Sequence, residues 1–290
     1  MLRLPSYIAA LILLLITHTA HAQPQHWLAK KGKTELMIIG SIHVGDDSMY
    51  PLPTNVTAFL KNSDGLIVEA DIRDANNITP PKPRLLARQV LDKKQRAHLK
   101  AIASEFGLNE ENLLDSPPWS AALTIEVLLV NKLGYQSEQG IDMHLIELAE
   151  QNDVPLLPLE TVQFQLDLIA NQHDGGKELL LASMEDFRNG QSLVKCLINS
   201  WKNGDLKTIE NITQHQETCD EFNDAFLYTR NRDWANKIDS GKIFSKKDGH
   251  YTLVVGSLHL IGKDNLIDLL KQRGFHIQPL GKTVPTVCDT

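Results

Sequence analysis

The stretch IIGSIHVGDD, residues 38–47, ends an apolar run with Gly-Ser and then places a histidine two residues further on. The stretch LVVGSLHLIG, residues 253–262, repeats this order near the other end of the chain. A short apolar run that stops at a glycine is typical of a buried strand, and the glycine permits a sharp turn or a close backbone approach at the edge of a sheet. The repeat therefore predicts two strands that deliver His43 and His259 to one edge of a shared sheet. Two surface loops with similar turn chemistry are the alternative interpretation.

Two further apolar runs end in a glutamate: GLIVEAD, residues 65–71, contains Glu69, and VPLLPLE, residues 154–160, ends at Glu160. A carboxylate at a strand exit can complete a metal shell or act as a general base. For one such glutamate taken alone, a solvated strand end is the favoured interpretation. Since histidine is a common metal ligand, two histidines and two glutamates at strand exits together predict one shared site.

The segment RNRDW, residues 230–234, lies on a predicted helix. Its first residue, Arg230, is suited to bind a carboxylate or to stabilise a developing oxyanion, because a guanidinium is planar and permanently charged. A cation on the helix surface is the alternative for this residue.

The strands alternate with helical segments along the chain. Residues 80–131 and 162–240 show mostly helical patterns, and no Pro/Gly/Ser-rich linker or low-complexity tract divides the sequence. This alternation predicts a single domain of the α/β (α+β) class over residues 23–290, with a large helical insertion.

Residues 1–22 differ from the globular pattern. Arg3 precedes the apolar run YIAALILLLI, and Ala20 and Ala22 are placed as in a cleavage site for a signal peptidase. A membrane anchor is the weaker interpretation, because this run is about half the ~20 residues that a spanning helix needs. We therefore expect a cleaved signal peptide over residues 1–22, a mature chain that begins at Gln23, a periplasmic or secreted location, and no stable membrane anchor after cleavage.

Charge and cysteine content narrow the functional classes. The chain of 290 residues has a formal net charge of −7 and no block of basic residues, so it lacks the electrostatic signature of a nucleic-acid-binding protein. Its three cysteines, Cys196, Cys219 and Cys288, would meet oxidising conditions after export. Three pairings are possible, and three free thiols are the alternative. We expect the Cys196–Cys219 disulfide, because these residues flank what reads as one helical hairpin.

Several segments together resemble the TraB/GumN family, which includes the Tiki proteins. The matching segments are GSIHVGDDSMYPLP, LIVEADI, GIDMHLIELAEQNDVPLLPLET, LYTRNRDWANKI and VVGSLHLIGKDNLIDLLKQRGF, in the order of the family. The resemblance implies a central mixed sheet that carries both GxxH motifs, in a fold related to the erythromycin esterases and ChaN-like proteins. It further implies a metal site of His43, His259 and Glu69, and a catalytic group of Glu69, Glu160 and Arg230.

These observations together predict a metal-dependent hydrolase, with peptidase activity as the narrower prediction. A divalent ion such as zinc, manganese or cobalt is the expected cofactor, and a peptide or a small molecule is the expected substrate. The alternative is a periplasmic protein that binds a peptide or haem in the same pocket without turnover. The sequence leaves the substrate, the metal and the oligomeric state open.

Overall fold

The computed structural model describes residues 22–73, 78–215 and 220–288. Within these residues six strands form one sheet, in the order β4-β3-β5-β2-β1-β6. Strands β4, β3, β5 and β2 run parallel to one another, whereas β1 is antiparallel to both β2 and β6. The α/β class and the mixed sheet that carries both histidine motifs are therefore confirmed.

The strands are β1 (His26–Lys31), β2 (Thr34–Ser41), β3 (Gly65–Ala70), β4 (Leu156–Glu160), β5 (His250–Gly256) and β6 (His276–Pro279). The helices are α1 (Thr54–Lys61), α2 (Ala87–Val90), α3 (Lys93–Glu105), α4 (Glu110–Leu114), α5 (Pro118–Lys132), α6 (Ile141–Glu150), α7 (Val162–Ala170), α8 (Lys177–Asn189), α9 (Gln191–Lys202), α10 (Leu206–His215), α11 (Asp220–Asn223), α12 (Thr229–Asp239) and α13 (Leu266–Gln272). Strand β1 has no counterpart among the predicted strands. It forms a hairpin with β2 through Gly32, whose φ of 60° favours glycine.

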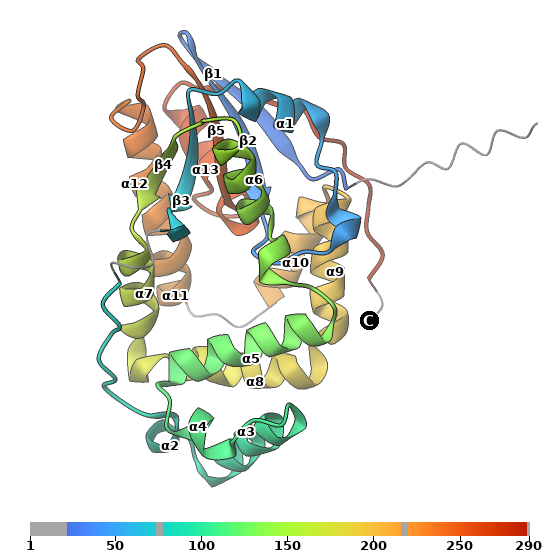
Figure 1. The fold of residues 1–290 in the computed structure, drawn as a ribbon, viewed down its shortest axis with the longest axis vertical. Coiled ribbons are helices and arrows are strands. Elements are labelled where there is room, and N and C mark those ends of the chain that lie inside the picture. Colours follow the sequence, from blue (N-terminus) through green and yellow to red (C-terminus); the bar gives the residue numbers. More distant parts are fainter. Residues whose placement is uncertain (1–21, 74–77, 216–219, 289–290) are drawn as a thin grey trace, which may run out of the picture.

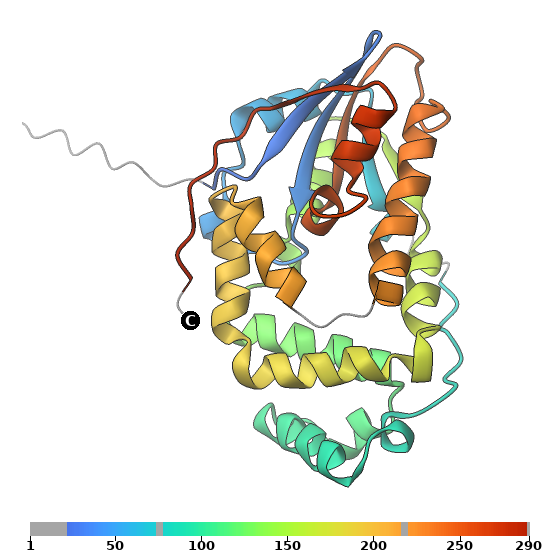
Figure 2. The ribbon, with the colours of Figure 1, turned by 180° about the vertical axis from the view of Figure 1, so that it is seen from behind.

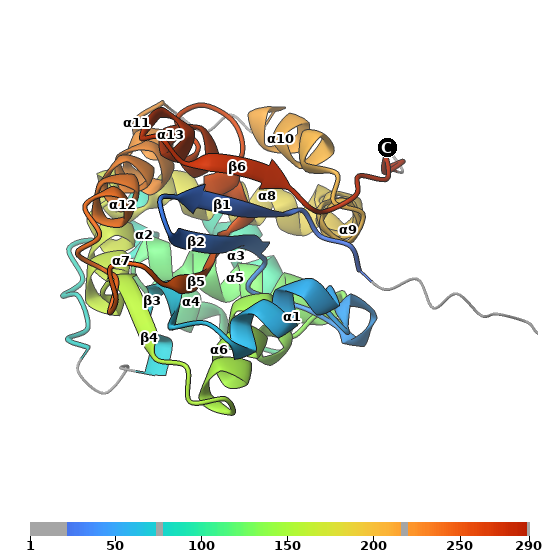
Figure 3. The ribbon, with the colours of Figure 1, turned by 90° about the horizontal axis from the view of Figure 1, so that it is seen from above.

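Successive side chains of β2 pack on opposite faces of the sheet, as the two-residue period of a strand requires. Met37 and Ile39 belong to an apolar core shared with α1 and α6. Leu36 and Ile38 belong to a second core, shared with α12 and α13. Figures 1 and 3 show these two pairs of helices on opposite faces of the sheet. Because both faces are covered, the central strands read as continuous apolar runs.

A separate helical layer lies beyond one end of the sheet. Helices α2 to α5 and α8 share an apolar core of their own, and α5 and α8 lie side by side (Figures 1 and 2). Helices α2 to α5 come from the long segment between β3 and β4, which is part of the predicted helical insertion. In Figure 2 the arrowhead of β2 points toward this layer, so the carboxyl ends of the parallel strands face it.

The two Gly-Ser turns lie next to each other on neighbouring strands. Gly40 is paired with Val255 and Ser41 with Gly256 in the parallel β2–β5 ladder. The hydroxyl of Ser257 donates to the carbonyl oxygen of Ser41 at 3.0 Å. A Cβ atom at Gly40 would lie 2.7 Å from the Ser257 oxygen, so the close approach requires glycine at this position. The predicted juxtaposition of the two motif strands is confirmed.

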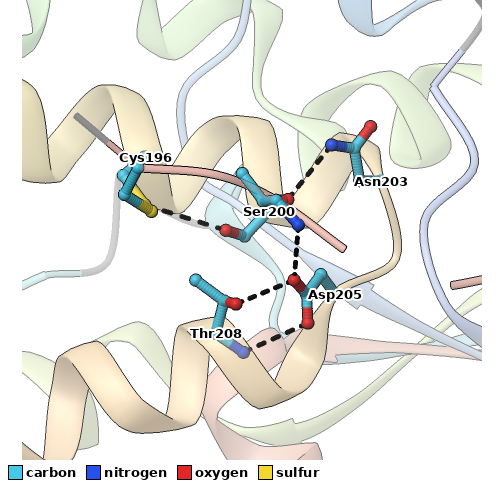
Figure 4. Close-up of a disulfide and its surroundings, with 7 residues drawn as sticks. Cys196, Ser200, Asn203, Asp205 and Thr208 are labelled. Carbon is cyan, nitrogen blue, oxygen red and sulfur yellow. Dashed lines mark hydrogen bonds between the residues drawn. A yellow bond between two sulfur atoms is a disulfide. The ribbon is translucent and has the colours of Figure 1, made fainter. Parts of the chain in front are cut away.

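A disulfide joins Cys196 of α9 to Cys288 near the carboxyl terminus. The predicted Cys196–Cys219 pair is therefore wrong, and Cys219 itself lies outside the described residues. The reason is tertiary: the end of the chain packs beside α9 and α10, where the Asp205 carboxylate accepts the backbone N–H of Thr286 at 2.8 Å. Figure 4 shows Cys196 and Asp205 in this region. A pair separated by 92 residues cannot be recognised from a local helical pattern.

Replacement of Cys288 by serine should lower the free energy of unfolding by about 2–4 kcal/mol, because the unfolded chain regains the entropy of an open loop. Urea unfolding under non-reducing conditions measures the change. Cys219→Ser is the matched control, and it should leave the Cys196–Cys288 pair and the stability unchanged. Peptide mapping that finds Cys196 bridged to Cys219 in the parent protein would contradict this assignment.

The predicted signal peptide lies almost wholly outside the described residues, which begin at Ala22. Across the described ranges, no helix combines the length and the apolar character that crossing a membrane requires. Export of the chain stays a prediction.

Candidate functional site

The carboxyl ends of the parallel strands gather most of the predicted site residues at one edge of the sheet. Glu69 lies at the end of β3, Glu160 ends β4, and His259 lies in the 3₁₀ turn that follows β5. Arg230 reaches them from α12, which covers one face of the sheet (Figure 1). Ligands of parallel α/β sheets bind at this edge, so the placement suits a functional site.

Arg230 lies between the two glutamates. Its Nη2 donates to Glu69 at 2.8 Å and to Glu160 at 2.9 Å, and its Nε donates to both Glu160 oxygens at 3.0 and 3.1 Å. Its Nη1 donates to the carbonyl oxygen of Phe226 at 3.0 Å and faces Nε2 of His259 at 3.3 Å. A guanidinium carries five N–H groups, and these acceptors account for all of them. The side chain, 9% exposed, is an internal cation.

The two glutamates have different surroundings. Glu160 is 5% exposed, and besides Arg230 it accepts the indole N–H of Trp234 at 2.8 Å. Glu69 accepts the backbone N–H of Gly256 at 2.7 Å and the side-chain amide of Gln165 at 3.2 Å. Burial raises the pKa of Glu69, but the nearby cationic groups and the Gly256 N–H outweigh burial and hold this pKa below its ordinary value. Glu69 is therefore an ionised carboxylate at neutral pH.

His259 is a buried, neutral imidazole. Its Nδ1 lies 2.6 Å from Oδ1 of Asn231, and its Nε2 lies 3.7 Å from Oε1 of Glu69. Trp234 packs against the ring, with the two ring centroids 4.4 Å apart. Burial, with a contribution from the Arg230 charge, lowers the pKa of His259 to about 4 although Glu69 acts in the opposite direction. The ring therefore carries a lone pair, and no charge, at physiological pH.

His43 is the exposed histidine of the pair, with 69% of its side chain accessible. Its Nδ1 lies 3.1 Å from Oδ2 of Asp142, in the first turn of α6. Gly140 permits the close approach of that turn, because a Cβ atom at this position would lie only 2.8 Å from the His43 carbonyl oxygen. The hydrogen bond to Asp142 raises the pKa of His43 above its ordinary value, and solvent screens part of this attraction. Because Nδ1 is engaged, Nε2 is the atom that can meet a ligand.

A pocket of about 360 Å³ opens beside His43 and Glu69. Asp142 and Gln165 add polar groups to its wall. Its apolar lining consists of Val68, Ala70, Ile72, Met143, Ile146 and Val254. The volume falls within the range of small-molecule sites, and the lining combines polar and apolar side chains. Among the described residues, Glu160, Arg230 and His259 do not line this pocket, and Arg230 contacts it through Glu69.

The donor types at this edge fit a divalent metal ion. Oε1 of Glu69 and Nε2 of His259 lie 3.7 Å apart, close to the separation of two ligands that each bind one ion at roughly 2.1 Å. Each histidine engages an oxygen acceptor through Nδ1, as metal-ligating histidines do. No group of three or more His, Cys, Asp or Glu side chains is arranged to hold a metal within the described ranges. The fit therefore rests on the donor types of Glu69 and His259, and His43 stays a predicted third ligand.

Four residues of the site were not predicted: Asp142, Gln165, Asn231 and Trp234. Asn231 and Trp234 follow Arg230 on α12 at positions i+1 and i+4, so the helical period places Arg230 and Trp234 on one face. That spacing could have indicated Trp234 as a neighbour of Arg230 from the sequence. Asp142 and Gln165 gave none, because each meets its partner, His43 or Glu69, only through packing between elements.

Comparisons with known proteins identify the family of this chain. The model of the TraB/PrgY/gumN family matches residues 25–279. Two curated relatives, each described as uncharacterized protein YbaP, come from Escherichia coli (strain K12) and Shigella flexneri. Each is 30% identical over 244 residues, which cover 83% of this chain and 89% of the relative. No solved structure matches the chain, so the expected likeness to erythromycin esterases stays a prediction. The chain belongs to the TraB/PrgY/gumN family.

Proposed function

We propose that the chain is a hydrolase of amide or ester bonds, with peptides as the favoured substrates, and that it uses a divalent metal ion. The observation that carries the proposal is the pairing of an ionised Glu69 with the unprotonated Nε2 of His259, 3.7 Å away. Both groups have lowered pKa values, so both keep their lone pairs free of protons at neutral pH. Such groups suit the binding of a cation better than the uptake of a proton.

His259, Glu69 and His43 would hold the ion, which we expect to be zinc, manganese or cobalt. The hydrogen bond to Asp142 raises the pKa of His43 to about 9, so this ring would have to release a proton when the ion binds. A bound divalent ion supplies Lewis-acid polarisation of a substrate carbonyl group. The apolar wall with Met143 and Ile146 would bind a substrate side chain and exclude water from it. Glu69 is the predicted glutamate that faces the pocket, and this proposal assigns it the role of metal ligand.

Arg230 and Glu160 have positioning roles in this proposal. Four N–H groups of Arg230 are bound by Glu69, Glu160 and Phe226. The fifth faces Nε2 of His259, whose single lone pair the proposed metal ion would take, so only this one N–H group would become free for a developing oxyanion. Glu160 is bound by Arg230 and Trp234 on its two oxygens. Together they fix the positions of the Glu69 carboxylate and the His259 ring, the two groups that would bind the ion in this proposal.

Alanine substitution of His43 or His259 should each lower the affinity for zinc by at least about tenfold, because each removes one ligand arm. The double substitution should be little worse than either single one, since the ligands act as a unit. Isothermal titration of zinc into chelator-treated protein measures these affinities. His276→Ala is the control, because this exposed residue lies on β6 at the opposite side of the sheet. Two single variants that bind zinc as the parent does would refute the shared site.

The second candidate function is capture of a peptide or haem without turnover. The apolar lining of the pocket favours this candidate, since an apolar surface binds a ligand without needing a reactive group. Purified protein distinguishes the two. A Soret absorption band indicates haem, whereas stoichiometric metal with cleavage of a mixed fluorogenic peptide library indicates the hydrolase.

We further propose that the hydrolase acts in the periplasm or outside the cell. The disulfide between Cys196 and Cys288 is compatible with an oxidising compartment. Intact mass of exported protein would give a mature chain that begins at Gln23. A chain that keeps residues 7–16 would contradict the proposed location.

A further inference from the structure

Asn231 lies directly behind the imidazole of His259, and its own orientation is fixed by a second contact. Its side-chain Nδ2 donates to the backbone carbonyl oxygen of Asp264 at 3.0 Å. A carbonyl oxygen accepts hydrogen bonds and cannot donate them, so the amide nitrogen of Asn231 must face Asp264. The amide oxygen must then face Nδ1 of His259, which lies 2.6 Å away.

The opposite side of the imidazole ring imposes the same requirement. Nη1 of Arg230, 3.3 Å from Nε2 of His259, is a donor without a lone pair. A proton on Nε2 would therefore point at an N–H group, whereas a bare Nε2 can accept from it. Glu69, whose Oε1 lies 3.7 Å from the same nitrogen, is close enough to share a cation with it.

We propose that Asn231 is the positioning residue that fixes His259 in the tautomer with its proton on Nδ1, so that the bare Nε2 faces Glu69. The tautomer follows from the contacts alone, and only its use rests on the proposed function, since a bare Nε2 is the form that binds a metal ion. Trp234 completes the arrangement, because its ring packs against His259 and limits rotation of the imidazole.

Histidine nitrogen NMR on selectively ¹⁵N-labelled protein tests the tautomer directly. In the parent protein we expect a single form of His259, with a slowly exchanging, hydrogen-bonded proton on Nδ1 and an unprotonated Nε2. The signal is assigned by its loss in His259→Gln. A proton found on Nε2 in the parent would overturn the inference whatever the variants show.

Three variants identify the partner. Asn231→Leu removes the acceptor at similar volume, so the protected Nδ1 proton should be lost. Asn231→Asp keeps an acceptor and makes it charged, so the Nδ1 proton should persist and shift downfield. Asn236→Leu is the matched control on the same helix, because Asn236 is exposed and bonds Arg273. An unchanged Nδ1 signal in Asn231→Leu, or in Asn231→Asp should the leucine variant not fold, would overturn the role of Asn231.

A zinc titration of the same variants separates this inference from the proposed function. Loss of the positioning residue should weaken zinc binding by about 10–100-fold. A parent protein that binds no zinc would refute the metal site, while the tautomer of His259 would still decide the role of Asn231. Unchanged zinc affinity in a folded Asn231→Leu variant that has lost its Nδ1 proton would show that the ligand role of His259 does not depend on Asn231, against our proposal.

Discussion

Replacement of Arg230 by methionine should lower the free energy of unfolding by about 3–5 kcal/mol, the cost of breaking a buried ion pair by removing one partner. Methionine keeps an unbranched apolar stem but leaves Glu69 and Glu160, 14% and 5% exposed, without their shared cation. Two carboxylates in one buried site then repel each other, and each loses charge-assisted hydrogen bonds. Urea unfolding of metal-free protein measures the loss.

The pH dependence of this deficit has a defined sign. In the parent, the pKa of Glu69 lies below its unfolded value, so Glu69 contributes stability above an unfolded pKa of about 4.3 that is lost as pH falls through the folded pKa. Without the charge of Arg230, the effect of burial, which raises the pKa of Glu69, is no longer offset. The pKa of Glu69 in the folded variant should therefore rise above its value in the unfolded chain. Protonation of Glu69 then removes the repulsion between the two carboxylates in the variant. The difference in free energy of unfolding between parent and variant should therefore shrink as pH falls below about 5.

Arg232→Met is the matched control for Arg230→Met. Arg232 lies on the same helix and also pairs with two acidic residues, Asp224 and Asp264, but all three side chains are substantially exposed. Solvent screens such pairs, so the control should change stability little. Adding Glu160→Gln to Arg230→Met should restore part of the lost stability, since it removes one of the two stranded charges. Equal stability of Arg230→Met and the parent would refute the internal-cation role.

Strands β2, β3 and β5 were predictable because they are buried on both faces and therefore read as continuous apolar runs. The edge strand β4 is only partly buried, but LLPLE still reads as an apolar run that ends in a glutamate. That pattern located the ends of β2, β3, β4 and β5, and with them His43, Glu69, Glu160 and His259. Strand β1 was not predicted because HWLAKK is short, begins with a polar histidine and ends in two exposed lysines, so it does not read as a continuous apolar run. Its pairing with β2 depends on the turn at Gly32, a glycine between two lysines that carries little apolar signal.

Contacts between distant elements could not be predicted in the same way. Asp142 meets His43 only because the first turn of α6 packs on the chain that follows β2, across 99 residues of sequence. Cys288 reaches Cys196 through the path of the final segment beside α9 and α10, which no local period encodes. The predicted catalytic role of Glu160 stays a prediction, but its contacts also come from packing that the sequence pattern does not show. A glutamate at a strand exit looks available in sequence, whereas Arg230 and Trp234 have already bound both of its oxygens.

The two glutamates should therefore respond differently to replacement by glutamine. Glu69→Gln should reduce cleavage of a mixed fluorogenic peptide library by about 10²–10⁴-fold, the range for loss of a group that handles protons or charge in the reaction. Its stability should fall by only about 1 kcal/mol, because Arg230 keeps its two-point contact with Glu160. Because Glu69 faces the pocket, its replacement should affect activity more than stability.

Glu160→Gln should show the opposite balance. It exchanges a carboxylate that accepts from Arg230 and Trp234 for an amide with one acceptor oxygen, so stability should fall by roughly 2–3 kcal/mol. Activity should fall less than in Glu69→Gln, since Arg230 retains Glu69 and the pocket wall is intact. Urea unfolding and the peptide assay on the same two preparations compare the effects. A stable but inactive Glu160→Gln beside an active Glu69→Gln would reverse the assignment. It would make Glu160 the reacting carboxylate, which requires Arg230 to release it when substrate binds.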